Sequence, residues 1–158
     1  MPEDEETSRA VLAARRLGLD HEVTRHGPVR SLAEAAAARG IDPHQLVKTM
    51  VVRVSADDHR FVLVPGDREI AWPRLRALLG VNRLTMASAD EALRLTGYER
   101  GTITPLGSRT ALPVVADSSI AGRISIGGGG HGVGLTVDAG DLLAAVGALV
   151  ADVTEPPG

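Results

Sequence analysis

The pattern of apolar and polar positions divides the chain into short helices and short strands. Runs rich in β-branched and apolar residues predict strands over 48–54, 61–65, 112–116, 123–126 and 133–137, with briefer candidates over 83–87 and 149–153. The turn residues Asp57 and Asp58 separate the first two runs, which predicts a hairpin. Residues 21–30 favour an extended or looped path, and the glycines and prolines of residues 96–108 predict a long loop.

Helix start signals precede most of the remaining apolar runs. The pairs Ser31–Glu34 and Ser88–Glu91 have capping-box spacing, in which a serine hydroxyl accepts the backbone N–H three residues on. The predicted helices cover residues 7–17, 32–39, 73–79, 89–95 and 138–148, with a helical turn over 42–45. Helices and strands do not alternate regularly. The chain is therefore predicted to form one α+β domain over residues 1–158 with a mixed, mainly antiparallel sheet, and residues 1–6 and 155–158 are expected to be flexible tails.

Composition limits the classes of function. Hydrophobic residues make up 44% of the 158 residues, so a core can form, but its aromatic side chains are limited to Phe61, Trp72 and Tyr98. There is no cysteine, and the five histidines lack metal-ligand spacing, so no metal site is expected. The net charge of −3 gives no global attraction to nucleic acid, so such binding needs a local site. No run approaches the about 20 apolar residues of a membrane span, and a cytoplasmic location is expected.

Lys48 is the only lysine among 17 basic residues. It lies where the helical turn passes into an apolar strand, on the same strand face as Met50 and Val52. Apolar walls would partly desolvate its amine, which could hold an anionic group or stabilise a developing oxyanion. A strand-edge lysine that reaches out to water is the alternative interpretation.

A glycine-rich segment follows the predicted strand 123–126. Residues 127–134 formally contain G-x-G-x-x-G, but a strand follows instead of the helix that a dinucleotide site requires, and the lysine of a Walker loop is absent. A flexible hairpin turn and a loop whose N–H groups approach a ligand oxygen both remain open. His26, before Gly27-Pro28, could line a pocket or be structural. Ser118-Ser119 is interpreted as a turn after a strand.

Two longer motifs occur in a specific order. Residues 45–52 read Gln-Leu-Val-Lys-Thr-Met-Val-Val, and residues 96–107 read Thr-Gly-Tyr-Glu-Arg-Gly-Thr-Ile-Thr-Pro-Leu-Gly. Segments 123–132 and 139–142 supply a strand-loop and a helix start. In this order they resemble the YbaK family of aminoacyl-tRNA deacylases, which is related to the inserted editing domain of bacterial prolyl-tRNA synthetase. The resemblance runs from about residue 26 to residue 152 and implies a barrel-like sheet with surrounding helices.

The resemblance also assigns roles to residues. It implies that Lys48 is the functionally essential lysine, that the loop of Gly101 and Pro105 shapes the site for the aminoacylated 3′ end, and that the glycine run forms the facing wall. Lys48 is thus the candidate catalytic residue. The candidate substrate-binding residues are His26, Thr49, Gly101, Thr102, Pro105, Gly127, Gly128, Gly129 and Asp141. No cofactor or metal is implied.

The implied function is trans-editing: hydrolysis of mischarged aminoacyl-tRNA, above all tRNA(Pro) carrying Cys, Ala or another small amino acid. No nucleophile stands out, so positioning and oxyanion stabilisation are expected to dominate catalysis. The expected partners are the tRNA acceptor end and prolyl-tRNA synthetase or an elongation factor, and neither DNA nor a membrane. Two alternatives stay open: a non-catalytic module that binds tRNA or synthetase, and a protein of the same fold that binds a small anion.

Four positions depart from the family pattern. Thr102 stands where a second glycine is frequent, Thr104 where serine is frequent, Ala139 where proline is usual, and His131 where many relatives have lysine or arginine. These changes bear on substrate identity more than on fold, and His131 weakens the expected cationic funnel.

Overall fold

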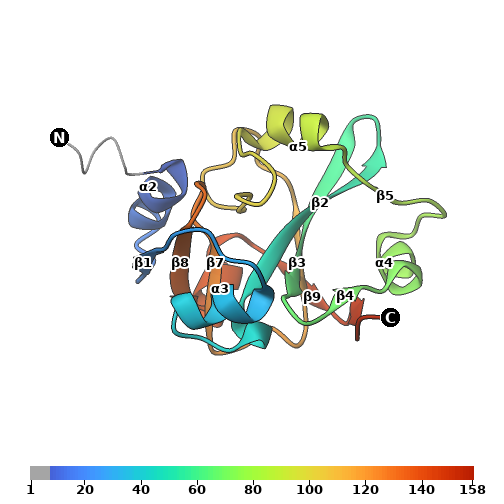
Figure 1. Cartoon of the computed structure of the whole chain (residues 1–158). Helices are drawn as coiled ribbons and strands as arrows, with labels where there is room; N and C mark the ends of the chain where they lie inside the picture. Colours follow the sequence, from blue (N-terminus) through green and yellow to red (C-terminus); the bar gives the residue numbers. More distant parts are fainter. Residues whose placement is uncertain (1–7) are drawn as a thin grey trace.

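The computed structural model describes residues 8–158 as one α+β domain with three sheets (Figure 1). The five-stranded sheet has the order β5-β2-β3-β6-β9, formed by β2 (Val47–Ser55), β3 (Asp58–Pro65), β5 (Thr85–Met86), β6 (Val114–Asp117) and β9 (Leu149–Ala151). The three-stranded sheet has the order β1-β8-β7, formed by β1 (Glu22–Arg25), β7 (Arg123–Gly127) and β8 (Val133–Asp138). The third sheet pairs β4 (Glu69–Ile70) with β10 (Thr154–Glu155).

The strand pairing confirms the predicted mixed, mainly antiparallel sheet. Only β3–β6 and β6–β9 are parallel among the described pairs. The barrel-like expectation needs correction, because β5 and β9 are the two unpaired edges of an open sheet. A parallel bridge between Leu46, directly before β2, and Ser125 of β7 links the two larger sheets.

The helices are α2 (Arg9–Arg16), α3 (Leu32–Ala38), α4 (Trp72–Leu79), α5 (Ala89–Thr96) and α6 (Ala139–Ala145), with a 3₁₀ turn η1 (Pro43–Gln45). The two helices with predicted capping serines, α3 and α5, begin directly after those serines, whereas α2 begins at Arg9 instead of residue 7 and α4 at Trp72 instead of residue 73. The Ser31 and Ser88 hydroxyls each accept the N–H of the glutamate three residues on, at 3.1 Å. Helix α6 ends before the predicted residue 148 because Gly147 takes a left-handed conformation with φ +63°.

Several short elements complete or correct the predictions. Residues 22–25, predicted as extended or looped, form a strand that pairs with β8. The predicted tail begins with Glu155, which pairs with Glu69 in a two-residue ladder. The predicted strand 112–116 begins only at Val114. Residues 1–6 and Thr7, the predicted first residue of the N-terminal helix, lie outside the described residues.

Strand β3 separates two apolar clusters. Phe61 and Leu63 face the cluster shared with the three-stranded sheet, α2 and α6, whereas Val62 and Val64 face the cluster that packs against Leu75 of α4. This alternation is the two-residue period of a strand buried on both faces. Strand β2 thus lies on a rigid partner, with α5 above it in Figure 1. None of the helices in residues 8–158 has the length and hydrophobicity needed to cross a bilayer.

Candidate functional site

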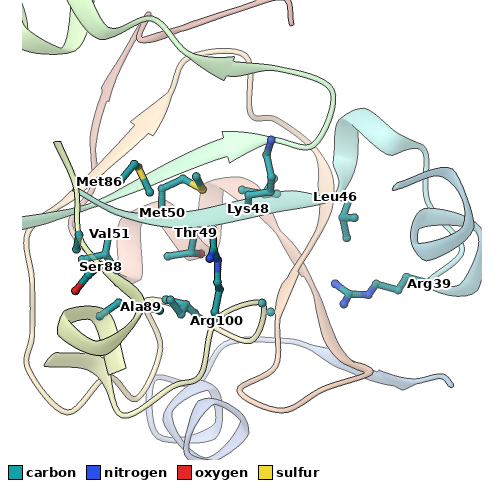
Figure 2. A pocket seen from close by; sticks show the side chains of 16 residues that line it. Arg39, Leu46, Lys48, Thr49, Met50, Val51, Met86, Ser88, Ala89 and Arg100 are labelled. Carbon is teal, nitrogen blue, oxygen red and sulfur yellow. The ribbon is translucent and has the colours of Figure 1, made fainter. Parts of the chain in front are cut away.

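A cavity of about 650 Å³ lies along the outer edge of β2 (Figure 2). Its walls come from β2, α5, the loop after α5, the end of β7 and the end of α3. The lining residues are Arg39, Leu46, Val47, Lys48, Thr49, Met50, Val51, Met86, Ala87, Ser88, Ala89, Ala92, Arg100, Gly101, Ile103 and Gly127. Three of these side chains are cationic and none is Asp, Glu or His. The cavity is therefore suited to an anionic or polar ligand and holds no carboxylate or imidazole base of its own.

The cavity exists because β2 is only partly paired on this side. Strand β5 pairs with β2 at Val52 and Arg53 alone, and the Ala87 N–H then donates to the Val51 carbonyl at 3.0 Å. Successive residues of an antiparallel strand point their N–H and C=O groups to opposite edges of the strand. Thr49, two residues before Val51, therefore presents its N–H and C=O to the same edge as Val51. The main chain of Thr49 thus offers a donor and an acceptor to the cavity.

The Thr49 side chain adds a third polar group. Its hydroxyl is buried and has no hydrogen-bond partner among residues 8–158. A buried hydroxyl without a partner carries a desolvation cost of about 1–3 kcal/mol, which a hydrogen bond would remove if a ligand displaced the atoms that cover it. In Figure 2 the Thr49 side chain and Arg100 lie on the same side of the strand.

Lys48 points the other way. Its Nζ donates to the Arg68 carbonyl at 3.0 Å, and Figure 2 shows it extending from the opposite side of β2 to Thr49. The side chain is exposed, so the expectation of a partly desolvated amine is wrong. Lys48 shares its strand face with Met50, as predicted, and both residues line the cavity and a second hollow of about 310 Å³. The ammonium therefore lies at the boundary between two spaces.

Two arginines that the sequence did not single out also line the cavity. Arg39 is half-buried and donates to His26 Nε2 at 3.3 Å and to Ser125 Oγ at 3.2 Å. Its burial lowers the pKa of the guanidinium from the usual value. Arg100 is exposed and follows α5 in the predicted loop. Arg100 lies within the motif of residues 96–107, directly before the predicted Gly101. No local pattern distinguished Arg39, because only folding over a long sequence separation brings it to the cavity.

The predicted site glycines Gly101, Gly127 and Gly128 have different structural roles. Gly101 is exposed with φ +86°, and no hydrogen bond from its N–H occurs within residues 8–158, so this amide is available at the cavity wall. A Cβ on Gly127 would lie 2.8 Å from the Ile103 carbonyl oxygen, so this glycine lets the loop after α5 pack directly on β7. The Gly128 N–H donates to Val133 O at 2.9 Å and is therefore occupied.

Four of the ten predicted site residues line the cavity: Lys48, Thr49, Gly101 and Gly127. The other six do not, namely His26, Thr102, Pro105, Gly128, Gly129 and Asp141. His26 lies behind Arg39 as a hydrogen-bond partner. Thr102 is buried and donates to the Glu99 carbonyl at 2.7 Å, which shapes the loop. Asp141 is exposed in the first turn of α6, where its N–H donates to Asp138 Oδ2 at 3.0 Å.

Comparison with known proteins matches this geometry to a family. A family described as the aminoacyl-tRNA editing domain matches residues 26–145. A crystal structure described as a candidate trans-editing enzyme for prolyl tRNA synthetase has a TM-score of 0.84 at 29% identity and covers 93% of this chain and 95% of that one. A structure of a hypothetical protein has the same TM-score at 30% identity and covers 94% of this chain and 100% of that one.

Curated relatives include proline–tRNA ligases. The Bacillus licheniformis enzyme is 32% identical over 109 residues, which are 67% of this chain and 18% of the ligase. The Caldicellulosiruptor saccharolyticus enzyme is 36% identical over 92 residues, which are 58% of this chain and 16% of the ligase. The chain thus spans less than a fifth of the length of these ligases. The family predicted from the two motifs is confirmed: this chain belongs to the aminoacyl-tRNA editing domain family.

Proposed function

We propose that this protein hydrolyses the ester that joins a wrongly attached amino acid to the 3′-terminal adenosine of tRNA, acting as a separate protein. The observation that carries the proposal is the main-chain edge of Thr49, which lines a cavity with three cationic side chains and has a buried hydroxyl without a partner beside it. Family membership supports the editing role, and the expected setting is the cytoplasm, where tRNA is charged.

Hydrolysis of this ester is acyl transfer to water, and its barrier comes from negative charge on the carbonyl oxygen. Water oxygen bonds to the carbonyl carbon, the bond to the ribose oxygen breaks, and that oxygen leaves as the hydroxyl with a proton taken from the water. In the proposal, the Gly101 N–H and the Thr49 hydroxyl or N–H stabilise the oxyanion. Each oxyanion donor contributes about 2.7–4 kcal/mol in well-studied acyl-transfer enzymes.

The cationic side chains position the substrate. Lys48 lies where the ribose or the phosphate behind it would cross between the two hollows, and Arg39 and Arg100 offer charge on the cavity side. Ser88 is the cavity's serine, but its hydroxyl accepts the Glu91 N–H at 3.1 Å and no histidine lines the cavity. These contacts favour attack by water, assisted by the neighbouring ribose hydroxyl, over a serine nucleophile.

The proposed substrate is tRNA(Pro) carrying Ala, Cys or another small amino acid. A synthetase cannot strongly reject residues that are smaller than its own, so a second site must remove them. The similarity to proline–tRNA ligases supports the prolyl system and makes prolyl-tRNA synthetase the proposed partner. With three aromatic side chains in the chain, stacking supplies limited RNA affinity, which is consistent with help from that partner. The comparisons offer no support for an elongation factor.

The test is a panel of mischarged tRNAs offered to wild type, Lys48→Ala and Arg123→Ala. Arg123 is the matched control, because it is an exposed cation that lies outside the cavity and pairs with Glu22 at 3.7 Å. We expect wild type and Arg123→Ala to hydrolyse Ala- or Cys-tRNA(Pro), and Lys48→Ala to lose at least about 10-fold in kcat/KM. Binding of tRNA without hydrolysis by wild type would instead identify a non-catalytic module.

A further inference from the structure

The hollow on the far side of Lys48 has its own chemistry. It measures about 310 Å³ and shares Lys48, Met50 and Met86 with the main cavity. Its remaining lining residues are Val64, Glu69, Ile70, Trp72 and Glu155. They come from β3, from the start of α4 and from the β4–β10 ladder, so the hollow connects the ester-binding cavity with a separate part of the fold.

The ladder places two carboxylates beside one indole. Glu69 and Glu155 face each other across the β4–β10 pair, and Trp72 begins α4 two residues after β4. Glu69 Oε1 accepts the Gly158 N–H at 3.2 Å, and neither glutamate has an ion-pair partner within residues 8–158. Arg68 makes no ion pair with them, because its Nε donates to Thr154 Oγ1 at 2.7 Å and its Nη2 to Thr154 O at 3.0 Å.

The two glutamates and Trp72 favour the base of a nucleotide over its phosphate. Two carboxylates repel a phosphate but accept hydrogen bonds from an exocyclic amine, as glutamate does from the N4 amine of cytosine. The half-buried Trp72 supplies a stacking surface for a base, and the two methionine thioethers can adapt to a flat ring. Lys48, at the boundary, is the cation that the linking ribose–phosphate needs.

We propose that this hollow is a subsite for a nucleobase that carries an exocyclic amine, stacked on Trp72 and donating to Glu69 or Glu155. The cytosines and the adenine of a tRNA acceptor end, cytidine–cytidine–adenosine, share that chemistry. The inference rests on the proposed function, because it assumes that the main cavity holds the ester. It adds that the acceptor end is read on both sides of Lys48.

The chain's single tryptophan makes a direct test available. Fluorescence of the wild-type protein is titrated with a cytidine–cytidine–adenosine RNA oligonucleotide, and a stacked base is expected to quench it saturably. Replacing each cytidine in turn by uridine, or adenosine by inosine, exchanges the amine for a carbonyl. One of these replacements is expected to weaken quenching about 10-fold or more and so identifies the base that is bound. Equal quenching by all the oligonucleotides, or no quenching, overturns the proposal.

Variants separate stacking from amine recognition. Trp72→Ala is expected to weaken oligonucleotide affinity about 5- to 100-fold, measured by anisotropy of a labelled oligonucleotide, and Trp72→Phe to retain most of it. Glu69→Ala or Glu155→Ala should remove the preference for cytidine over uridine, or for adenosine over inosine. Asp152→Ala is the matched control, because Asp152 is exposed, lies outside the hollow and pairs with Arg74 at 2.9 Å. Quenching of the wild type by alaninamide at equal affinity would show an amine site instead and would overturn the proposal.

Trp72 also packs on the apolar cluster around Leu75, so Trp72→Ala could lose affinity by unfolding. Thermal melting shows whether Trp72→Ala is unfolded. If it is, the titrations of wild type with the uridine and inosine oligonucleotides test the subsite instead. Failure of this subsite is distinguishable from failure of the proposed function. Deacylation that depends on Lys48 but not on Trp72 or the base amines would contradict the subsite alone. Amine-selective quenching without any deacylation would contradict the proposed hydrolase activity and support the subsite.

Discussion

At the residue scale, the proposed function depends most on two neighbouring residues of β2. Lys48 and Thr49 have side chains on opposite faces of the strand, so Thr49 lines the main cavity and Lys48 also lines the second hollow. Lys48 is exposed and bonded to a carbonyl, which suits a cation that holds a substrate rather than a desolvated amine. Thr49 is the residue whose polar groups face the proposed reaction.

A substitution at Thr49 is therefore expected to lower activity without lowering the free energy of unfolding. Thr49→Val keeps the shape and removes a buried hydroxyl that has no partner, so stability in urea should be unchanged or higher by about 1 kcal/mol. Activity on mischarged tRNA should fall about 10- to 100-fold if the hydroxyl contacts the ester, and Thr49→Ser should retain most of it. A valine variant with wild-type kcat/KM would show that the hydroxyl has no part in the reaction.

At the scale of elements, α5 forms the cavity wall opposite β2, and polar contacts of Glu91 hold it there. Glu91 in its first turn accepts from His59 of β3 at 2.8 Å and lies 3.8 Å from Arg53 of β2. His59 is 5% exposed, so the contact lies against the core. The hydrogen bond from His59 lowers the pKa of Glu91 below its usual value, with smaller help from Arg53, while burial opposes the shift.

The sign of this shift predicts a pH dependence. A depressed folded-state pKa means that Glu91 stabilises the fold above the ordinary glutamate pKa and that this contribution disappears as pH falls through the folded pKa. Glu91→Gln should therefore cost about 1 kcal/mol in urea unfolding at pH 7, and the difference from wild type should shrink below about pH 4.5. Asp90→Asn, a neighbouring exposed acid, is the control and should show a smaller effect. A pH-independent cost of Glu91→Gln would contradict this account.

Sequence patterns predicted those elements whose signals are local. Ser31 and Ser88 mark helix starts because a capping hydroxyl acts within one turn. Strands β4 and β10 were missed because two residues show no periodicity, and their pairing depends on a partner far along the chain. The same limit applies to the site: motifs predicted Lys48 and Thr49, whereas Arg39 reaches the cavity only through the tertiary fold.

At the scale of the whole molecule, the cavity lies between β2 of the five-stranded sheet and the end of β7 of the three-stranded sheet. The Leu46–Ser125 bridge links the two sheets beside the cavity, and Gly127 lets the loop after α5 pack against the end of β7. The glycine run is thus a packing feature at its first position, where a Cβ would lie 2.8 Å from the Ile103 carbonyl oxygen. Gly127 lies against the protein's own backbone at Ile103, so this position supports neither a flexible turn nor an N–H group aimed at a ligand oxygen.

The glycine run offers a matched pair of substitutions. Gly127→Ala should destabilise the protein by about 1–3 kcal/mol and raise KM, because backbone at Ile103 must move and the Gly101 loop moves with it. Gly130→Ala should be close to neutral, since its Cβ would meet only a Val133 methyl at 3.5 Å. Urea unfolding and steady-state kinetics measure both effects, and equal behaviour of the two variants would contradict the packing role.

The central claim is hydrolysis of mischarged tRNA by this chain alone. The most direct measurement is a single-turnover time course of amino acid release from Ala-tRNA(Pro), with Pro-tRNA(Pro) alongside and no synthetase present. The account predicts release from Ala-tRNA(Pro) well above the spontaneous rate and little or none from Pro-tRNA(Pro). Release from neither substrate above the spontaneous rate, at saturating protein and with Cys-tRNA(Pro) equally stable, would contradict it.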